Sequence, residues 1–398
     1  MDEALKIIPS TQHRETRTLL GATAGMRLLK LQDETKTQQI LDEVSKTLRQ
    51  YPVSFQGARI LDGKEEGSLG WVTVNYLLGT FIRYSYIQSW IHPKQAVMVG
   101  AMDLGGASTQ MTFQPSGNIE DKGTEMSFRL YGFDYTIYTH SYLCYGQDQA
   151  LKILLVHLIE KRVSSNVQHP CYPKGYRAIV PLSSVYNSPC IKSSPGNIQD
   201  NVTVEGTGDS YECQLSVTKI FNFCTNTSCS FDGVYQPPVH GSFYAFSAFY
   251  YTFNFLNLTC EQSLSEANSS IWQYCARDWI ALSTSFPSED KRRLLEYCSS
   301  AMYILTLLEK GYKFNSSTWS KITFAKQAGN ADVGWTLGYM LNQTNMIPSE
   351  GPSLLKAHPY DIWVATIFFI VLSVVTGLVA APLHCYRRNA CAEQAWWT

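Results

Sequence analysis

The sequence has few charged residues and almost no net charge. Of its 398 residues, 16% are charged, 45% are hydrophobic, and the formal net charge is −1. Low charge with high hydrophobic content excludes disorder as a description of the whole chain. No basic stripe is present to pair with the phosphates of a nucleic acid, so we exclude nucleic acid as a partner. The length is sufficient for two domains with a substantial core.

Several familiar short motifs are also missing. The sequence contains no P-loop, H-E-x-x-H, C-x-x-C or G-x-S-x-G. Their absence argues against Walker NTPases, zincins, thioredoxin-like redox proteins and α/β-hydrolases. Met1 to Ser10 lacks both the cationic segment and the apolar run of a signal peptide.

One long uncharged run lies near the C-terminus. Ile362 to Pro382 is 21 residues long, enough to cross a bilayer as a helix. Tyr360 and Trp363 lie at one edge of the run, where aromatic side chains favour the membrane interface. Arg387 and Arg388 follow on the other side. By the positive-inside rule, we expect a cytoplasmic tail and a large domain outside the plasma membrane.

Cysteines and glycosylation sequons agree with an extracellular domain. Nine of the eleven cysteines precede the apolar run, which indicates disulfides. Six N-x-S/T sequons lie on the same side, beginning at Asn201, Asn226, Asn257, Asn268, Asn315 and Asn342. Because no segment before Ile362 could carry this domain across a membrane, we expect the true N-terminus to lie upstream of Met1. Cys385 and Cys391 are candidate palmitoylation sites.

Strands and helices alternate in the first 160 residues, a pattern that favours an α/β fold with its ligand at strand ends. The helix predicted at 34–50 carries Ile40, Leu41, Val44 and Leu48 on one stripe. The other predicted helices are 147–162, the aromatic segment 242–258, and 291–310. The predicted strands are 16–21, 58–61, 97–102, 126–131, 134–138 and 321–325.

A strand, an acid and a glycine turn occur together between Ala101 and Phe113. The buried run ends in Asp103, Gly105 and Gly106 follow, and a second strand begins after them. The glycines allow main-chain amides to converge on an anion, with the carboxylate facing a metal ion. A hairpin with an incidental acid is equally consistent with this stretch.

Two further strand-to-helix turns carry polar groups. Thr23 opens a helix whose free amides could hold an anion, although a simple helix cap accounts for it as well. Glu65 and Glu66 begin another helix. Acids in a first turn usually complement the helix dipole, whereas the alternative is a general base for water.

Four stretches in order resemble one family. They are G-A-T-A-G-M-R from Gly21, E-E-G-S-L-G-W-V-T-V-N-Y-L-L-G from Glu65, D-L-G-G-A-S-T-Q from Asp103 and G-W-T-L-G-Y-M-L-N from Gly334. They resemble apyrase conserved regions two to five of the cell-surface ectonucleoside triphosphate diphosphohydrolases. The resemblance implies an α/β fold like that of actin, Hsp70 and sugar kinases, with two RNase H-like lobes around a nucleotide cleft.

The resemblance also implies domain bounds and a missing part. The remainder of a first lobe would comprise 1–63 and 326–357, and the second lobe 64–325. The membrane helix 362–382 and the cytoplasmic tail 383–398 would follow. The family's first conserved region, an Asp-x-Gly-Ser phosphate loop after an N-terminal membrane helix, does not occur in this sequence. We therefore expect an incomplete first lobe.

The activity implied by the resemblance is hydrolysis of extracellular ATP, ADP, UTP and UDP to monophosphates with Ca²⁺ or Mg²⁺. Glu66 would be the catalytic base, and Asp103 and Gln110 would hold the metal through water. The nucleobase would lie between Tyr251 and Arg293, with Trp335 in a structural or cleft-lining position. The phosphate-binding residues would be Thr23, Ala24, Gly25, Gly105, Gly106, Ala107 and Ser108.

The resemblance further implies the disulfides Cys144–Cys190, Cys171–Cys213, Cys224–Cys229 and Cys275–Cys298, whereas spacing alone allows 105 pairings of eight cysteines. Cys260 would remain as a buried free thiol.

An alternative to the hydrolase function is an inactive membrane glycoprotein that binds nucleotide or pairs with full-length subunits. The oligomeric state is open, with a homo-oligomer as one expectation.

Overall fold

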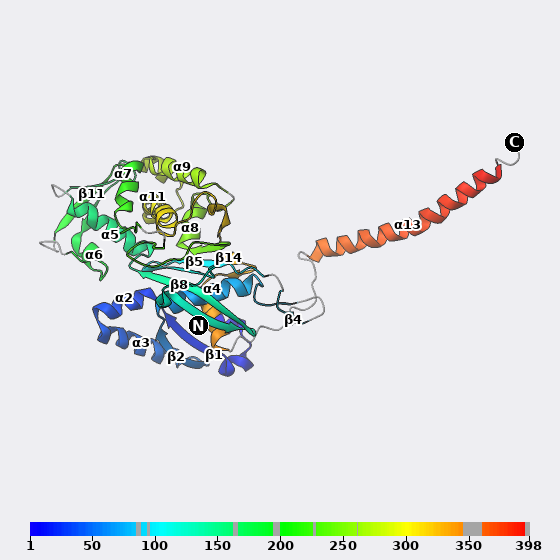
Figure 1. The fold of residues 1–398 in the computed structure, drawn as a ribbon, viewed down its shortest axis with the longest axis horizontal. Coiled ribbons are helices and arrows are strands. Elements are labelled where there is room, and N and C mark those ends of the chain that lie inside the picture. The colour runs from blue at the N-terminus through cyan, green and yellow to red at the C-terminus, as the bar shows by residue number, and fades with distance from the viewer. Residues whose placement is uncertain are drawn as a thin grey trace. The chain divides into compact units, whose positions relative to one another are not determined.

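The computed structural model describes residues 1–84, 89–93, 96–161, 166–193, 200–225, 228–260, 262–344 and 360–394 (Figure 1). Two compact units are present. One comprises Met1–Arg83 and Ile91–Pro348, and the other comprises Tyr84–Trp90 and Ser349–Thr398. The predicted division of the first unit into two lobes at 63/64 and 325/326 stays a prediction.

The helices of the described residues, with their short 3₁₀ and π segments labelled η, are α1 (Asp2–Ile7), η1 (Ser10–Glu15), α2 (Ala24–Gln32), α3 (Glu34–Leu48), α4 (Gly63–Leu77), η2 (Lys122–Thr124), α5 (Gln147–Glu160), α6 (Leu182–Tyr186), α7 (Ser210–Thr218), α8 (Ala248–Phe255), α9 (Leu264–Cys275), α10 (Trp279–Ser285), α11 (Lys291–Thr306), η3 (Leu307–Gly311), η4 (Trp319–Lys321), α12 (Trp335–Gln343) and α13 (Tyr360–Gln394). The strands are β1 (Arg17–Ala22), β2 (Ser54–Ile60), β3 (Arg83–Tyr84), β4 (Trp90–Ile91), β5 (Gly100–Leu104), β6 (Ser108–Phe113), β7 (Glu125–Leu130), β8 (Phe133–Leu143), β9 (Asn166–His169), β10 (Arg177–Pro181), β11 (Asn201–Gly206), β12 (Phe243–Ser247), β13 (Ile322–Phe324), β14 (Gln327–Ala328) and β15 (Ala331–Asp332).

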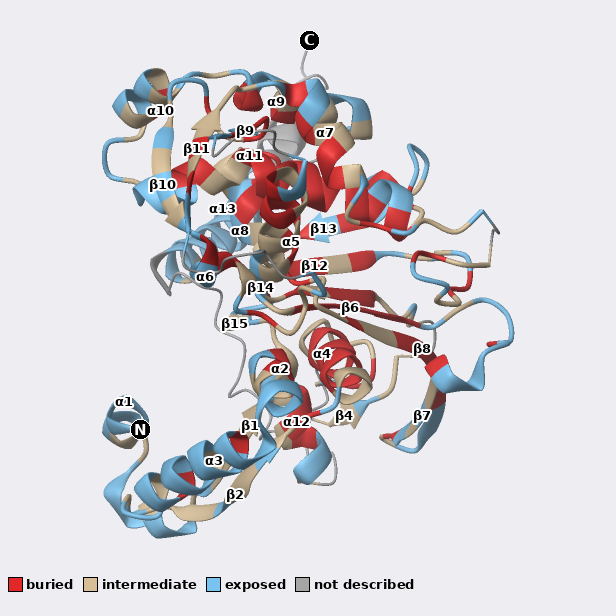
Figure 2. Cartoon of the chain, turned by 90° about the vertical axis from the view of Figure 1, so that its left-hand side faces the viewer, coloured by how far each residue is buried: buried red, intermediate tan, exposed pale blue. Residues whose placement is uncertain are grey.

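A six-stranded mixed sheet lies at the centre of the first unit, in the order β13-β12-β5-β6-β8-β7. Strand β12 runs parallel to β5 and β13, and the pairs β5–β6, β6–β8 and β8–β7 are antiparallel. Helix α4 packs on one face, whereas α8 and the buried helix α11 belong to the core on the other (Figure 2).

Strand periodicity decides which polar residues face α4. Ala101 contributes to the core beside α4, whereas Met102 and Leu104 contribute to the core of the opposite face. Because successive side chains alternate between faces, Asp103 points to the same side as Ala101. The register then sets Asp103 opposite Gln110 of β6, and Gln110 opposite Ser141 of β8. Pairing between strands thus gathers these polar side chains beside the start of α4.

A second, smaller sheet consists of the parallel strands β1 and β2, with α2 and α3 packed beside it. The predicted helix at 34–50 is present as α3, but its apolar stripe is only partly correct. Ile40 and Val44 are each 37% exposed, whereas Thr37 and Ser45 are buried. The helix rests on a sheet two strands wide among the described residues, so its flank extends beyond the strands into solvent.

The aromatic segment 242–258 is not one helix, as predicted, but strand β12 followed by helix α8. Pairing of β12 between β5 and β13 stabilises an extended Phe243–Ser247 that local spacing could not distinguish from a helix. Ser247, at φ 57°, turns the chain from strand to helix. The strands predicted at 126–131 and 134–138 correspond to β7 and β8, the latter being longer, and the helix at 147–162 corresponds to α5.

The cysteine-rich part contains four disulfides, Cys144–Cys190, Cys171–Cys213, Cys224–Cys229 and Cys275–Cys298, the pairings implied by the family resemblance. Cys260 is a free cysteine as expected, but its side chain is exposed rather than buried. It lies just after a tight turn at Asn257, outside the core.

The predicted sequons lie mostly at the surface. Asn201, Asn257, Asn315 and Asn342 are exposed, and Asn268 is half-buried. Asn226 lies outside the described residues. Glycosylation of these asparagines stays a prediction.

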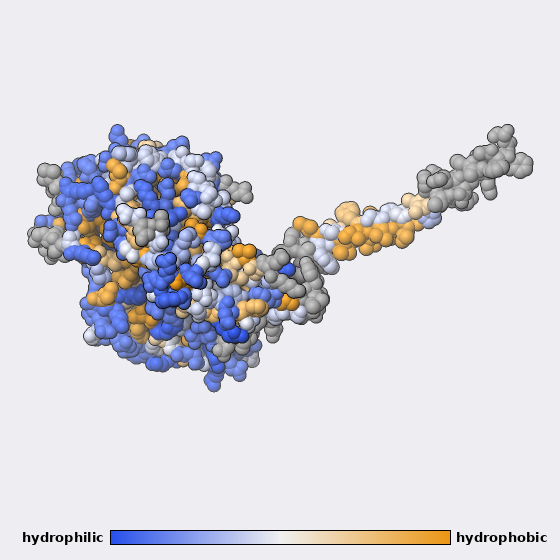
Figure 3. Space-filling view, in the orientation of Figure 1, coloured by the Kyte–Doolittle hydropathy of each residue, from blue (hydrophilic) through white to orange (hydrophobic). Residues whose placement is uncertain are grey.

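Helix α13 of the second unit contains the predicted membrane span. Its segment Ile362–Leu383 has a mean hydropathy of 2.6, and length and composition suffice for crossing a bilayer. Apolar side chains are exposed along it (Figure 3). The side chains of Cys385 and Cys391 lie outside the described residues, so palmitoylation there stays a prediction.

Candidate active site

The first predicted phosphate loop lies where β1 leads into α2. Thr23 is the N-cap of this helix, and its side chain accepts no amide as a cap. The main-chain carbonyl of Thr23 accepts the amides of Met26 and Arg27, at 3.0 and 3.1 Å. The amides of Ala24 and Gly25 belong to the first turn, where the helix itself supplies no acceptor. They are therefore suited to hold an anion at the positive end of the helix.

The second predicted phosphate loop joins β5 to β6 and is held by the start of α5. The carbonyls of Gly105, Gly106 and Ala107 accept amides of Gln147, Gln149 and Cys144, at 2.8, 3.1 and 2.8 Å. The amide of Gly105 donates to the carbonyl of Ser108 at 3.0 Å, whereas the amides of Gly106 and Ala107 have no backbone acceptor among the described residues. These two amides are suited to an anion-binding nest.

The glycines of this region permit a close approach. A Cβ on Gly146 would lie 2.3 Å from the amide nitrogens of Ala107 and Ser108. A Cβ on Gly106 would lie 2.7 Å from Oδ2 of Asp148. The second loop and α5 therefore fit together only because both positions lack a side chain.

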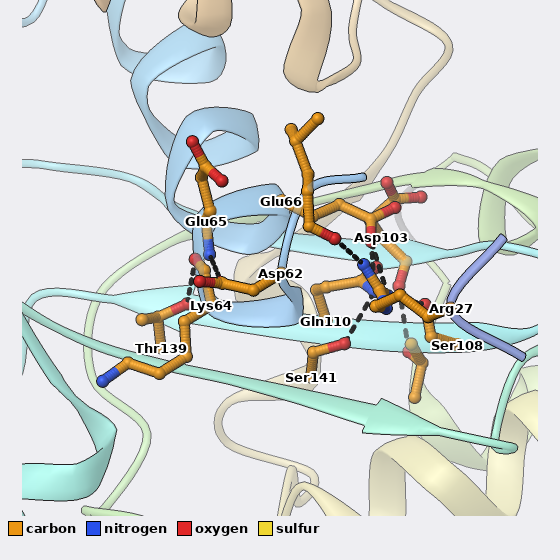
Figure 4. Close-up of polar contacts among 12 residues, drawn as sticks. Arg27, Asp62, Lys64, Glu65, Glu66, Asp103, Ser108, Gln110, Thr139 and Ser141 are labelled. Atoms are coloured by element: carbon orange, nitrogen blue, oxygen red, sulfur yellow. Dashed lines mark hydrogen bonds and ion pairs between the residues drawn. The ribbon is translucent and has the colours of Figure 1, made fainter. Parts of the chain in front are cut away.

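Glu66 lies in the first turns of α4, which Asp62 caps by accepting the amide of Glu65 at 2.7 Å. The side chain of Glu66 is buried, and its Oε2 accepts from Arg27 Nη2 at 2.8 Å and from Gln110 Nε2 at 3.3 Å (Figure 4). Burial raises the pKa of the Glu66 carboxyl, and the Arg27 guanidinium opposes that rise. The Glu66 carboxyl is thus largely removed from solvent, and its ion pair with Arg27 favours the ionised form.

Asp103 lies on the neighbouring strand, and its Oδ1 is buried without a hydrogen-bond partner. Burial and the nearby Glu66 charge raise the pKa of the Asp103 carboxyl to about 7, and a hydrogen bond with Ser247 lowers it. Oε1 of Gln110 is also buried without a partner. Two unpartnered oxygens on facing strands suit a cation that completes its shell with water.

A divalent cation therefore fits the chemistry of this corner. Among the described residues no cluster of three or more His, Cys, Asp or Glu side chains could enclose a metal ion. Magnesium characteristically retains several waters and takes one or two protein carboxylates together with substrate phosphates. Asp103 and Gln110 match such a sparse oxygen set.

One cavity of about 520 Å³ brings the two loops and Glu66 together. All seven predicted phosphate-binding residues line it. Its remaining walls come from α2, the start of α5 and the loop 187–189. Asp103 and Gln110 are not lining residues of this cavity. Trp335 is not one either: its indole packs against Gly21 of β1, where a Cβ would lie 2.5 Å away.

A second cavity of about 440 Å³ contains both residues predicted to hold the nucleobase. Tyr251 of α8 is 55% exposed, and Arg293 of α11 is also exposed. Both line the cavity, and Asp148 at the start of α5 lines this cavity as well as the first. An aromatic face and a guanidinium beside an anion site are suited to a nucleotide.

Three residues of this region were not predicted from the sequence. Arg27 lies in the Gly21–Arg27 motif but was assigned no role there. Asp148 lines both cavities, and Oγ of Ser141 accepts a hydrogen bond from Nε2 of Gln110 at 3.0 Å. Arg27 is the charged residue of the Gly21–Arg27 stretch, and this was the one signal in the sequence that could have identified it. Nothing local distinguishes Asp148 or Ser141.

Comparisons with known proteins identify the family. The GDA1/CD39 (nucleoside phosphatase) family matches residues 1–356. Ectonucleoside triphosphate diphosphohydrolase 8 of Gallus gallus is 53% identical over 396 residues, which is 98% of this chain and 80% of that protein. The Homo sapiens protein of the same name is 50% identical, over 97% and 79%. Ectonucleoside triphosphate diphosphohydrolase 2 of Gallus gallus is 44% identical, over 98% and 79%.

Among solved structures, a nucleoside triphosphate hydrolase from Neospora caninum aligns with a TM-score of 0.57 at 16% identity, covering 83% of this chain and 73% of that one. At this identity the match concerns the fold, and it confirms the predicted α/β class of the actin-like kind. From its sequence and its relatives, this chain belongs to the GDA1/CD39 (nucleoside phosphatase) family.

Proposed function

We propose that this protein hydrolyses the terminal phosphate of extracellular nucleoside tri- and diphosphates, among them ATP, ADP, UTP and UDP, to give monophosphates. The observation that carries the proposal is the single cavity lined by Thr23 to Gly25, Gly105 to Ser108 and Glu66. Relatives of about 50% identity are named for nucleoside triphosphate diphosphohydrolysis, which supports the same assignment.

The chemistry requires positioning, charge neutralisation and an oriented nucleophile. In the proposed mechanism the amides of the two loops hold the phosphates. Glu66 accepts a hydrogen bond from a water molecule, aligns it with the terminal phosphorus and takes its proton as the new O–P bond forms. The bridging P–O bond to the next phosphate breaks in the same displacement, so the shortened nucleotide leaves with the bridging oxygen and inorganic phosphate remains. Tyr251 and Arg293 hold the nucleobase in the second cavity, which Asp148 joins to the first.

A Ca²⁺ or Mg²⁺ ion is part of the proposal. Asp103 and Gln110 would hold it through water, consistent with the unpartnered Oδ1 and Oε1 of these side chains. When bound, the cation neutralises negative charge on the phosphates. The loops and Glu66 carry the remaining steps.

The proposed location follows from α13 and the covalent features of the first unit. We place α13 in the plasma membrane, with residues 1–361 outside and the tail after it in the cytosol. Four disulfides and exposed sequon asparagines support an oxidising, glycosylating route for the large domain. Oligomerisation with a second copy is a further part of this proposal.

A second candidate function is nucleotide binding without efficient turnover. The sheet formed by β1 and β2 has two strands among the described residues, and two parallel strands alone provide little support for a loop. Because Thr23 directly follows β1, a poorly supported first loop would bind phosphate yet orient it badly.

Phosphate release from ATP and from ADP by the purified full chain separates the two candidates. We expect release with Ca²⁺ or Mg²⁺ that stops on chelation, and a loss on the order of 10²–10⁴-fold in Glu66→Gln, the usual size of a general-base effect. Binding of a hydrolysis-resistant ATP analogue should survive the substitution. Analogue binding without any release by the unsubstituted chain would favour the second candidate, and near-normal turnover of Glu66→Gln would refute the role of Glu66.

A further inference from the structure

The guanidinium of Arg27 connects three elements around the candidate base. Its Nη1 donates to the carbonyl of Leu61 at 2.9 Å, just before α4 begins. Its Nη2 donates to Oε2 of Glu66 at 2.8 Å and to Oγ of Ser108 at 3.2 Å. Figure 4 shows Arg27 approaching Glu66 and Ser108. One side chain of α2 is thus bonded to the end of β2, to α4 and to β6.

Arg27 itself does not line the cavity. Its side chain is 14% exposed, and it is absent from the residues that line either cavity, whereas Glu66 and Ser108 line the first. An arginine near phosphates is commonly a direct phosphate ligand, because its planar fork matches two oxygens. Here protein acceptors occupy both terminal nitrogens of that fork.

We propose that Arg27 is a positioning residue for hydrolysis, which acts through Glu66 and Ser108 and does not bind the phosphates. This inference rests on the function proposed above. The anchor on Leu61 fixes the guanidinium, and the guanidinium in turn fixes one oxygen of Glu66, so the carboxylate is held toward the cavity in one orientation. The bond to Ser108 ties the second phosphate loop to the same frame.

Geometry of this kind matters because reacting groups tolerate little displacement. A misplacement of about 1 Å can cost on the order of 10²-fold in rate. The side chain of Glu66 has three rotatable bonds, and the described donors to its Oε2 are Arg27 and Gln110. Of these, the charged donor at 2.8 Å is the stronger. Without it, the neutral donors Gln110 and Thr23 would hold the carboxylate less firmly, and other rotamers would become accessible.

A second arginine–glutamate pair at the start of α4 provides a matched control. Arg59 of β2 donates from Nη1 to Oε2 of Glu65 at 2.8 Å, and Glu65 is the residue before Glu66 on α4. Neither Arg59 nor Glu65 lines the first or the second cavity. Arg59→Met therefore removes an arginine–glutamate pair at the same turn of α4, together with the hydrogen bond and the ring contact that Arg59 makes with Tyr339, without removing the partner of the candidate base.

Steady-state kinetics with ATP on the full chain test the proposal. In Arg27→Met we expect kcat to fall on the order of 10²-fold with KM changed less than threefold, because the effect is on orientation. Arg27→Lys should recover part of kcat by keeping one charged donor. The double variant Arg27→Met/Glu66→Gln should lose far less than the product of the two single losses, since Arg27 acts chiefly through that carboxylate and only its weaker bond to Ser108 remains to be lost. Arg59→Met should leave kcat within about twofold of the unsubstituted chain.

Other results would overturn the proposal. A tenfold or larger rise of KM, or of the Kd for a hydrolysis-resistant ATP analogue, in Arg27→Met would make Arg27 a phosphate ligand. Multiplicative losses in the double variant would separate Arg27 from Glu66. If Arg27→Met does not fold, Arg27→Lys answers the same question by its kcat and KM.

The proposal stays testable if the unsubstituted chain releases no phosphate. That result would count against hydrolysis as the function of this chain. The interaction of Arg27 with Glu66 would then be measured through thermal stability and nucleotide binding. We then expect the shifts in Tm of Arg27→Lys and Glu66→Gln to be non-additive in the double variant, with analogue binding unchanged. Additive shifts, or analogue binding weakened tenfold by Arg27→Lys, would refute the positioning role.

Discussion

Asp103 gives the most quantitative prediction about this protein. Its ionised form is unfavourable in the folded chain, because burial and the Glu66 charge raise the pKa of its carboxyl from 3.8 to about 7. A raised carboxyl pKa favours folding below the unfolded value, and this contribution is lost as the pH rises through the folded value. With 1.36 kcal/mol for each pKa unit, the Asp103 carboxyl destabilises the folded chain by about 4 kcal/mol at pH 8, where it is ionised, and by about 2 kcal/mol at pH 5.5, where the folded state has taken up a proton that the unfolded state has not.

We therefore expect the metal-free chain to gain about 2 kcal/mol of unfolding free energy between pH 8 and pH 5.5 from Asp103 alone. Asp103→Asn cannot ionise and should lose this part of the pH dependence. The pH dependence that remains in Asp103→Asn has contributions of both signs: burial raises the pKa of Glu66, which acts like Asp103, whereas burial lowers the pKa of His140 to about 4 and of His169 to about 3, which favours unfolding as the pH falls. Urea unfolding followed by fluorescence, with a chelator present, measures both chains at the two pH values.

The comparison between the two chains is what decides this prediction. Equal changes of unfolding free energy in the unsubstituted chain and in Asp103→Asn would show that the carboxyl is well solvated, and would refute the reasoning. Adding Ca²⁺ or Mg²⁺ at pH 8 should stabilise the unsubstituted chain more than Asp103→Asn, since a bound cation favours the ionised carboxyl.

Three further predictions concern packing and binding. Gly146→Ala should weaken binding of a hydrolysis-resistant ATP analogue at least tenfold by calorimetry, because its Cβ would lie 2.3 Å from the amide of Ala107 and must displace the second loop. Gly338→Ala should lower the free energy of unfolding in urea by about 1–3 kcal/mol, since its Cβ would lie 2.1 Å from the carbonyl of Leu69 where α12 meets α4. Tyr251→Ala should weaken analogue binding by about 0.5–2 kcal/mol through loss of an aromatic face, while binding of inorganic tripolyphosphate stays unchanged.

Each of these has its own control. Gly117→Ala introduces a Cβ with nothing within 4 Å and should change neither binding nor stability measurably. Unchanged analogue binding in Gly146→Ala would mean that the second loop does not hold phosphate. An unchanged unfolding free energy in Gly338→Ala would contradict the tight contact of α12 with α4. Equal losses for the analogue and tripolyphosphate in Tyr251→Ala would argue against a nucleobase contact.

Much of the local structure follows from the sequence. Alternating apolar residues predicted strands at 126–131 and 134–138, and a 3.6-residue period predicted the helix at 147–162, all present as β7, β8 and α5. These elements have the side-chain pattern that their own secondary structure requires. The aromatic segment 242–258 was interpreted wrongly because Phe- and Tyr-rich runs fit a buried helix and a central strand equally well. Pairing with β5 and β13, distant in the chain, made its first part a strand.

The candidate site divides in the same way. Sequence alone determined the chemistry on offer, namely two glycine-containing turns, the acids Glu66 and Asp103, and an apolar run fit to cross a membrane, because residue type and order decide these. Only the tertiary structure decided that Arg27 bonds Glu66 at 2.8 Å, that Asp148 borders both cavities, and that Trp335 packs against Gly21. Such contacts join residues from 39 to 314 positions apart. Local propensity cannot predict contacts between residues so far apart in the sequence, because strand register and helix packing determine which of them meet.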